Sequence, residues 1–228
     1  RAEMLAEYFG HDGGSTQDWR VKGHAVTPFW RWVASWGAVV KMPSDLGYPD
    51  EGFALPPLRM HEHVIPVTDW NPAEQGTLFA MPAQGLLAQR KARRGTTDAR
   101  VELAASLTGG PDQAIVWCEL NDEQDAISDA LGDQCVSIDG KTHDDIKVER
   151  CERWLAGHIK VMVTKTAMFG FGINMQNCHR VIFIGASNSY ERTYQAIRRC
   201  WRFGQTLPVD VHIVASELEA AVIENYRR

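Results

Sequence analysis

Short apolar strands alternate with helices through the second half of the sequence, and this order constrains the fold more than any other feature. The segment 114–120 is an apolar run, and the helix predicted after it begins with Asn121 and early acidic residues and ends at Gly132. The same alternation continues to the end of the chain, with further strands predicted at 135–140, 158–165, 179–185 and 209–215. A final helix is predicted from Ser216. Buried strands separated by helices predict an α/β domain with a largely parallel sheet.

The first part of the chain has a different character. Residues 1–60 contain four of the eight tryptophans, and 27–40 is a helix candidate whose aromatic residues spread around the helix axis. We interpret these rings mainly as core. An irregular connection rich in Pro and Gly follows at 42–58, then a strand at 60–67. We therefore predict a helical and irregular Trp-rich region at 1–68 and an α/β domain at 69–228, whose first part, 72–108, is largely helical.

Composition excludes few functions. The formal net charge of −5 argues against a broadly basic nucleic-acid coat, although local basic patches remain compatible with it. No apolar run reaches membrane-spanning length, and the five cysteines are scattered without a CxxC pair, so we expect a soluble cytoplasmic protein with reduced thiols. The alternating His61 and His63 are interpreted as part of a strand, and no metal site is predicted.

The segment YQAIRRCWRFGQ, at 194–205, places arginines in an otherwise apolar, aromatic helix. Helical spacing predicts two stripes, a polar one and an apolar one. The polar stripe is Gln195, Arg199 and Arg202, and the apolar stripe is Tyr190, Tyr194, Ile197 and Trp201. From this segment alone, the polar stripe is either a solvated surface or a cationic site.

A glycine-rich turn at 164–175 follows a buried strand, where α/β sheets place ligand sites. Gly170 and Gly172 allow a tight turn or a close approach to a ligand. The turn lacks the third glycine of a dinucleotide fingerprint, and the 228 residues contain no GxxxxGK[ST] phosphate loop. Taken alone, it indicates no more than a tight turn.

Taken in order, the segments within about 113–215 resemble the second RecA-like lobe of superfamily 2 helicases, most closely the Swi/Snf-like branch of DNA translocases. Motif V of that branch is similar to the turn, at Thr166, Gly170, Gly172, Ile173 and Asn174. Motif VI is similar to the arginine helix, at Gln195, Arg199, Arg202, Gly204 and Gln205. Arg198 departs from the family, which usually has Asp there. The Trp-rich region resembles an elaboration of some phage and prophage helicases.

The resemblance implies a nucleotide site shared between two lobes. ATP and Mg²⁺ would bind in a full-length parent whose first lobe supplies the phosphate loop and the magnesium carboxylates, and no tightly bound cofactor is expected on this chain. Arg202 would be the arginine finger and Arg199 its companion. Gln195 and Gln205 would hold the loop or contact nucleotide, and Asn174 would lie near the ribose or couple the lobes. Gly170 and Gly172 would also belong to the cofactor-binding residues. Residues 1–68 would be the end of lobe one or the connection between lobes.

The resemblance also implies a nucleic-acid partner, double-stranded DNA held by its backbone. Starts of helices after strands hold phosphates without reading bases, and the candidates are Thr142, Lys165 and Thr166. For each of these, a helix cap or an exposed turn is the alternative. The other expected partner is the missing first lobe, and no membrane is expected.

Two other classes of protein stay open. A non-catalytic nucleic-acid-binding or interaction module could keep the fold without the chemistry, but such a relic is expected to lose Arg199 or Arg202. An unrelated α/β nucleotide-binding domain needs a phosphate loop or an acid/base pair. Asp139 and Asp144 are more simply interpreted as caps.

Overall fold

The computed structural model of the chain describes residues 2–11, 19–66, 95–168, 173–185, 187 and 189–219. The chain divides into two compact units, Arg1–Ala54 and Leu55–Arg228. No helix in the described part of the chain is long and apolar enough to cross a membrane.

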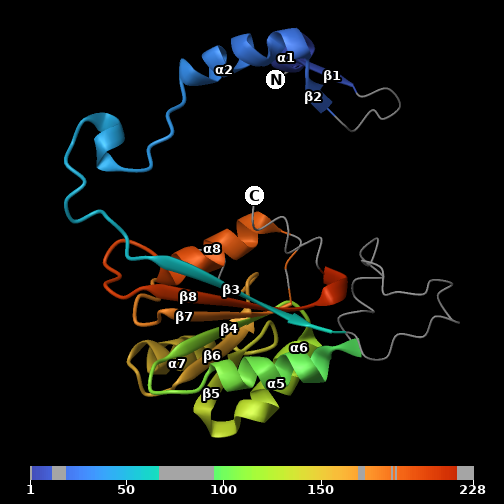
Figure 1. Ribbon diagram of the computed structural model, residues 1–228, viewed down its shortest axis with the longest axis vertical. Coiled ribbons are helices and arrows are strands. Elements are labelled where there is room, and N and C mark those ends of the chain that lie inside the picture. Colours follow the sequence, from blue (N-terminus) through green and yellow to red (C-terminus); the bar gives the residue numbers. More distant parts are fainter. Residues whose placement is uncertain are drawn as a thin grey trace, which may run out of the picture. The chain divides into compact units, whose positions relative to one another are not determined.

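The first unit is small and contains two short α-helices and a two-stranded sheet (Figure 1). Its elements are α1 (Ala2–Tyr8), β1 (Phe9–His11), β2 (Trp19–Val21), α2 (Val26–Ala34) and two 3₁₀ turns at Gly23–Ala25 and Pro43–Leu46. The two strands pair antiparallel, from Phe9 opposite Val21 to His11 opposite Trp19. The helix predicted at 27–40 is thus confirmed as α2, which ends earlier.

The aromatic rings of this unit pack on one another and are not enclosed as the sequence suggested. Tyr8 stacks on Trp32 with ring centroids 5.7 Å apart, and Trp32 meets the edge of Trp36 at 5.3 Å. None of the residues of α2 is buried, and Trp30 and Trp36 are 61% and 67% exposed. The interpretation of these tryptophans as core is therefore wrong for this unit, because so short a segment cannot enclose large rings on all sides.

The second unit is built on a six-stranded sheet with the order β3-β8-β7-β4-β6-β5. Every neighbouring pair of strands is parallel. The strands are β3 (Leu58–Ile65), β4 (Ala114–Cys118), β5 (Cys135–Ile138), β6 (Val161–Lys165), β7 (Arg180–Ile184) and β8 (Val209–Ser216). The predicted parallel sheet and the positions of its strands are confirmed.

Helices cover both faces of this sheet (Figure 1). They are α5 (Thr97–Leu107), α6 (Asn121–Leu131), α7 (Asp144–Leu155) and α8 (Tyr190–Cys200), with 3₁₀ turns at Gly132–Gln134 and Glu217–Glu219. On one face α7 and α8 bury Trp154 and Ile197 with Trp117. On the other face α5 and α6 bury Ala104 and Ile127 against the alternate residues of the strands. Strand alternation explains the two cores, since successive side chains point to opposite faces.

The unit boundary differs from the predicted one. Residues 58–65 pair with β8 from Leu58 opposite Val209 to Ile65 opposite Ser216, so β3 belongs to the second unit. The proposed role of 1–68 as the end of lobe one or a connection stays a prediction. Most of the predicted helical region 72–108, and most of the predicted final helix, lie outside the described residues.

Three histidines and one aspartate share a face of β3 and β8. His61 Nε2 lies 2.7 Å from Asp210 Oδ1, and His63 Nε2 lies 3.0 Å from His212 Nδ1. The rings of His61 and His212 stack at 4.6 Å. No group of three or more His, Cys, Asp or Glu residues within the described ranges has the arrangement of a metal site. Burial, followed by the charges of His61 and His63, lowers the pKa of His212 to about 4, against the opposing effect of Asp210.

We expect acid to destabilise the second unit through His212. Its folded pKa of about 4 lies below the ordinary value of 6.5, so the unfolded chain binds more protons between these two values. The free energy of unfolding is not reduced by His212 above pH 6.5. It falls by about 1–3 kcal/mol as the pH decreases from 6.5 towards 4. Urea unfolding of wild type and His212→Gln between pH 7 and 4.5 measures it, and the variant should show a flatter pH dependence. His158→Gln, at an exposed histidine, is the matched control. An unchanged pH dependence in His212→Gln would contradict the assignment.

Candidate nucleotide and nucleic-acid sites

The carboxyl ends of β4, β6 and β5 lie side by side, because these three parallel strands are neighbours in the sheet. Two of the predicted nucleic-acid residues meet the loop after β4 there. Thr166 Oγ1 donates to Glu119 Oε1 at 3.1 Å, and Lys165 Nζ donates to Asn121 Oδ1. Thr166 is buried and Lys165 is partly exposed. The structure therefore brings Lys165 and Thr166 to the start of α6.

A buried ion pair between α5 and α6 stabilises the loop after β4. Arg100 Nη1 on α5 lies 2.6 Å from Glu123 Oε1 on α6, and both side chains are 0% exposed. The second carboxylate oxygen, Glu123 Oε2, accepts from the backbone N–H groups of Glu119 and Leu120 at 3.3 and 3.1 Å. The turn that carries Glu119 is thus anchored to two helices.

The turn after β5 is organised by Asp139. Its Oδ1 accepts from the backbone N–H of Thr142 at 2.8 Å and from the Thr142 hydroxyl at 2.6 Å. The Thr142 hydroxyl hydrogen bond, together with backbone N–H groups, lowers the pKa of Asp139. Thr142 is therefore a turn-stabilising residue in this structure, the alternative that the sequence left open. Lys141, at the tip of the same turn, is exposed.

The predicted arginine residues lie at the opposite edge of the sheet. α8 follows the carboxyl end of β7 and runs back along the sheet, so its last residues reach the segment that precedes β7. Met175 N donates to Arg199 O at 3.0 Å. Gln205 Nε2 donates to the carbonyls of Gln176 and Cys178 at 3.1 and 3.2 Å. The structure thus separates the arginines from Thr142, Lys165 and Thr166.

The faces of α8 differ from those predicted by helical spacing. The buried stripe is Thr193, Ala196, Ile197 and Cys200, and Arg199 is 9% exposed beside it. Tyr190 and Tyr194 are 58% and 41% exposed and stack on each other. The helix ends at Cys200, so Arg202 follows the helix and is partly exposed. Periodicity shows which residues share a side, but packing against the sheet decides which side is buried.

The remaining predicted site residues have mixed surroundings. Gln195 and Asn174 are exposed. Gln205 is buried, and its Oε1 accepts from the backbone N–H groups of Thr206 and Leu207, each at 3.0 Å. Gln205 therefore holds its own turn, one of the two roles expected for it. Gly170 and Gly172 lie outside the described residues.

Sequence reasoning missed the residues that support the two sets of predicted site residues, those at the carboxyl ends of the strands and the arginines at the end of α8. These residues, Glu119, Asn121, Glu123 and Arg100, matched no motif. Only the position of the first three, between β4 and the first turn of α6, indicated a role, and Arg100 on α5 gave no such signal. Gln176 was also missed, although it directly follows the motif-like turn at 164–175.

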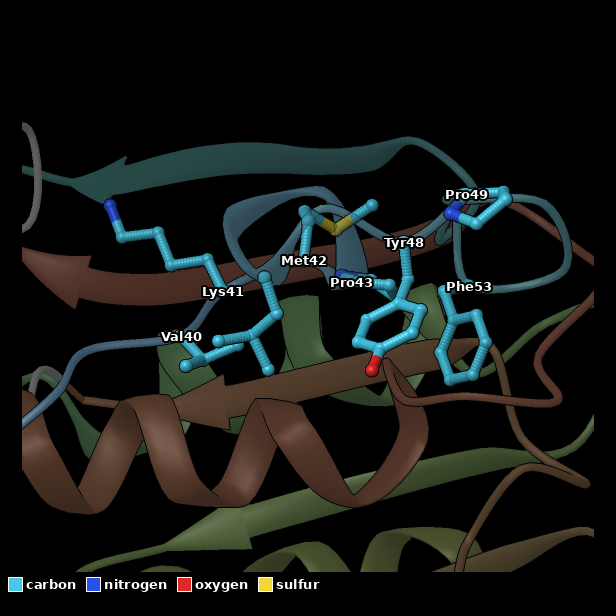
Figure 2. Close-up of a pocket in the computed structure, with 8 residues that line it drawn as sticks. Val40, Lys41, Met42, Pro43, Tyr48, Pro49 and Phe53 are labelled. Atoms are coloured by element: carbon cyan, nitrogen blue, oxygen red, sulfur yellow. The ribbon is translucent and has the colours of Figure 1, made fainter.

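A separate pocket of about 560 Å³ lies in the first unit. Its lining side chains come from one continuous segment, 40–53, and include Met42, Tyr48 and Phe53 (Figure 2). Nothing in its lining matches the motifs discussed above, and it contains one ionisable amine, Lys41.

The fold and motif positions agree with a known domain. Residues 99–204 match the family described as the helicase conserved C-terminal domain. The matched residues lie within the second unit, which has a RecA-like α/β fold. No curated protein matches the chain significantly.

Solved structures of several proteins are similar to the chain. The C-terminal part of the Fun30 ATPase domain is 20% identical, with a TM-score of 0.49, and the match covers 57% of this chain and 44% of that one. The E. coli DEAD-box protein SrmB, bound to regulator of ribonuclease activity A (RraA), is 16% identical, with a TM-score of 0.51 and coverage of 57% and 78%. A DEAD box protein from the hyperthermophile Methanococcus jannaschii is 16% identical, with a TM-score of 0.50 and coverage of 57% and 36%. The chain thus spans less than half of the Fun30 structure, and likeness to the two DEAD-box structures supports the fold.

Proposed function

We propose that the chain is the C-terminal half of an ATP-dependent DNA helicase or translocase of superfamily 2, in the Swi/Snf-like branch. The observation that carries the proposal is the helicase C-terminal domain match at 99–204, which includes Arg199 and Arg202. The chain has no phosphate loop of its own. It would therefore complete an ATP and Mg²⁺ site whose phosphate loop and magnesium carboxylates belong to a first lobe.

On the nucleotide side, Arg202 is the proposed finger. It is partly exposed just beyond α8, and Arg199 lies buried next to it. Burial, and then the positive charge of Arg202, lower the pKa of Arg199. A guanidinium remains charged under these conditions and offers planar, forked donors to phosphate oxygens. Two neighbouring arginines suit the charge of a γ-phosphate.

On the nucleic-acid side, the three loops at the carboxyl ends of β4, β5 and β6 are the proposed contact. The ammonium groups of Lys165 and Lys141 bring positive charge to neighbouring loops at this edge. Such groups bind phosphates and read no bases. Contacts of this kind fit duplex DNA held by its backbone.

The proposal that a first lobe supplies the phosphate loop is tested by assaying chain 1–228 and the full-length parent in parallel. With ATP, Mg²⁺ and duplex DNA, the parent is expected to hydrolyse ATP in a DNA-stimulated manner, and chain 1–228 is expected to show no turnover above buffer. The same chain should bind a duplex oligonucleotide with an affinity that falls as salt increases. Robust hydrolysis by chain 1–228 would refute the half-site assignment, and a parent without DNA-stimulated hydrolysis would refute the function.

A further inference from the structure

We infer that Gln176 is a positioning residue that fixes the arginine-bearing turn, defined as residues 201–205. For its effect on catalysis, the inference rests on the function proposed above. Its structural content does not, since it concerns contacts within the second unit.

Gln176 reaches the arginine-bearing turn with its side chain. Its Nε2 donates to the carbonyl of Phe203, the residue after Arg202. Its Oε1 accepts from Asn174 Nδ2 at 3.0 Å, and its backbone N–H donates to Asn174 Oδ1 at 3.2 Å. The side chain must donate at one end and accept at the other, which an amide does and a carboxylate cannot. The orientation of the amide is thereby set.

Gly204 is the matching partner of Gln176. Its φ of +95° lies in the region that favours glycine. A Cβ at this position would lie 2.7 Å from Gln176 Nε2 and 3.2 Å from both Cδ and Oε1. The glycine therefore provides both the turn and the space through which Gln176 reaches Phe203.

Two further hydrogen bonds connect the segment 175–176 to the chain before and after Arg202. Met175 N donates to Arg199 O at 3.0 Å, ahead of Arg202. After Arg202, Gln205 Nε2 donates to Gln176 O at 3.1 Å. The backbone on both sides of Arg202 is thus held by the segment 175–176, and Gln176 makes the contact nearest to the arginine in sequence. Loss of this contact should let the Arg202 backbone shift, and small displacements of catalytic groups are costly.

The structural part is tested by hydrogen exchange of chain 1–228 with two neighbouring amide-to-carboxylate variants. Gln176→Glu places an acceptor against the Phe203 carbonyl, and amides within 203–207 should exchange about tenfold faster or more, since local openings are governed by local contacts. Asn177→Asp is the control, because Asn177 Nδ2 donates to Gln113 Oε1 and not to this turn. Amides of β4 should keep their protection in both variants. Gln176→Asn, which keeps the amide but is too short, replaces the first variant if that one fails to fold.

The catalytic part is tested in the full-length parent. Gln176→Glu should lower kcat for DNA-stimulated hydrolysis about 10–100-fold with KM for ATP little changed, the pattern of a displaced group acting in the transition state. Asn177→Asp should retain wild-type kcat. Unchanged exchange at 203–207, or faster exchange with wild-type kcat, would overturn the inference. Arg202→Ala, measured in parallel, reports on the proposed function itself: if its turnover is unchanged, that function fails, while the exchange result still decides whether Gln176 holds the turn.

Discussion

Arg202→Ala in the full-length parent is expected to lower DNA-stimulated ATP turnover by about 10³-fold or more, the lower end of the range for arginine fingers in GTPases. The physical reason is that a guanidinium stabilises charge on the transferred phosphoryl group in the transition state. Binding of ATP and DNA should be nearly retained, because the interaction strengthens mainly as that charge develops. Steady-state turnover with matched ATP and DNA binding assays measures the effect.

Two variants sharpen this test. Arg202→Lys keeps a positive charge but loses the forked donors, so most of the loss should remain. Arg192→Ala removes an exposed arginine from the first turn of α8, far along the helix from Arg202, and should leave turnover within a few fold. Wild-type turnover in Arg202→Ala would show that the arginine is a solvated surface residue, and the site assignment would be abandoned.

Glu123→Ala is expected to destabilise the second unit by about 3–5 kcal/mol, the usual result when one partner of a buried ion pair is removed. The pair is fully enclosed, with 0% exposure on both side chains and 2.6 Å between Arg100 Nη1 and Glu123 Oε1. The variant leaves a guanidinium in the interior and also releases the backbone N–H groups of Glu119 and Leu120. Urea unfolding of chain 1–228 followed by far-ultraviolet circular dichroism measures the change.

An exposed pair supplies the control. Lys147 Nζ lies 2.9 Å from Asp144 Oδ1, and the aspartate side chain is 89% exposed. Asp144→Ala should cost at most about 1 kcal/mol, as expected for a surface pair. The double variant Arg100→Met/Glu123→Leu should recover part of the loss, because no buried charge is then left without its partner. Equal costs for Glu123→Ala and Asp144→Ala would contradict the account.

The buried ion pair and the proposed nucleic-acid loops are connected through the loop after β4. Glu123 anchors the backbone of Glu119, whose carboxylate accepts from Thr166. A variant at Glu123 should therefore also disturb the proposed nucleic-acid loops, although Glu123 itself is fully buried.

The sequence alone determined the succession of strands and helices in the second unit and the parallel sheet that they form. Short apolar runs separated by capped helices are local signals, and β4, α6, β6 and β7 depend on little else. The motif-like positions of Arg199 and Arg202 were also found in the sequence, through the resemblance to motif VI, because such motifs are continuous in sequence.

Tertiary structure decided what depends on contacts between distant segments. Helical periodicity placed Arg199 on a polar stripe, but packing against the sheet buried it and left Tyr190 exposed. β3 joined the second unit through pairing with β8, whose residues lie far away in the sequence. The contact of Gln176 with Phe203, and the Arg100–Glu123 pair, likewise join separate segments. No local pattern specifies these contacts, because each forms only once the sheet has brought its two partners together.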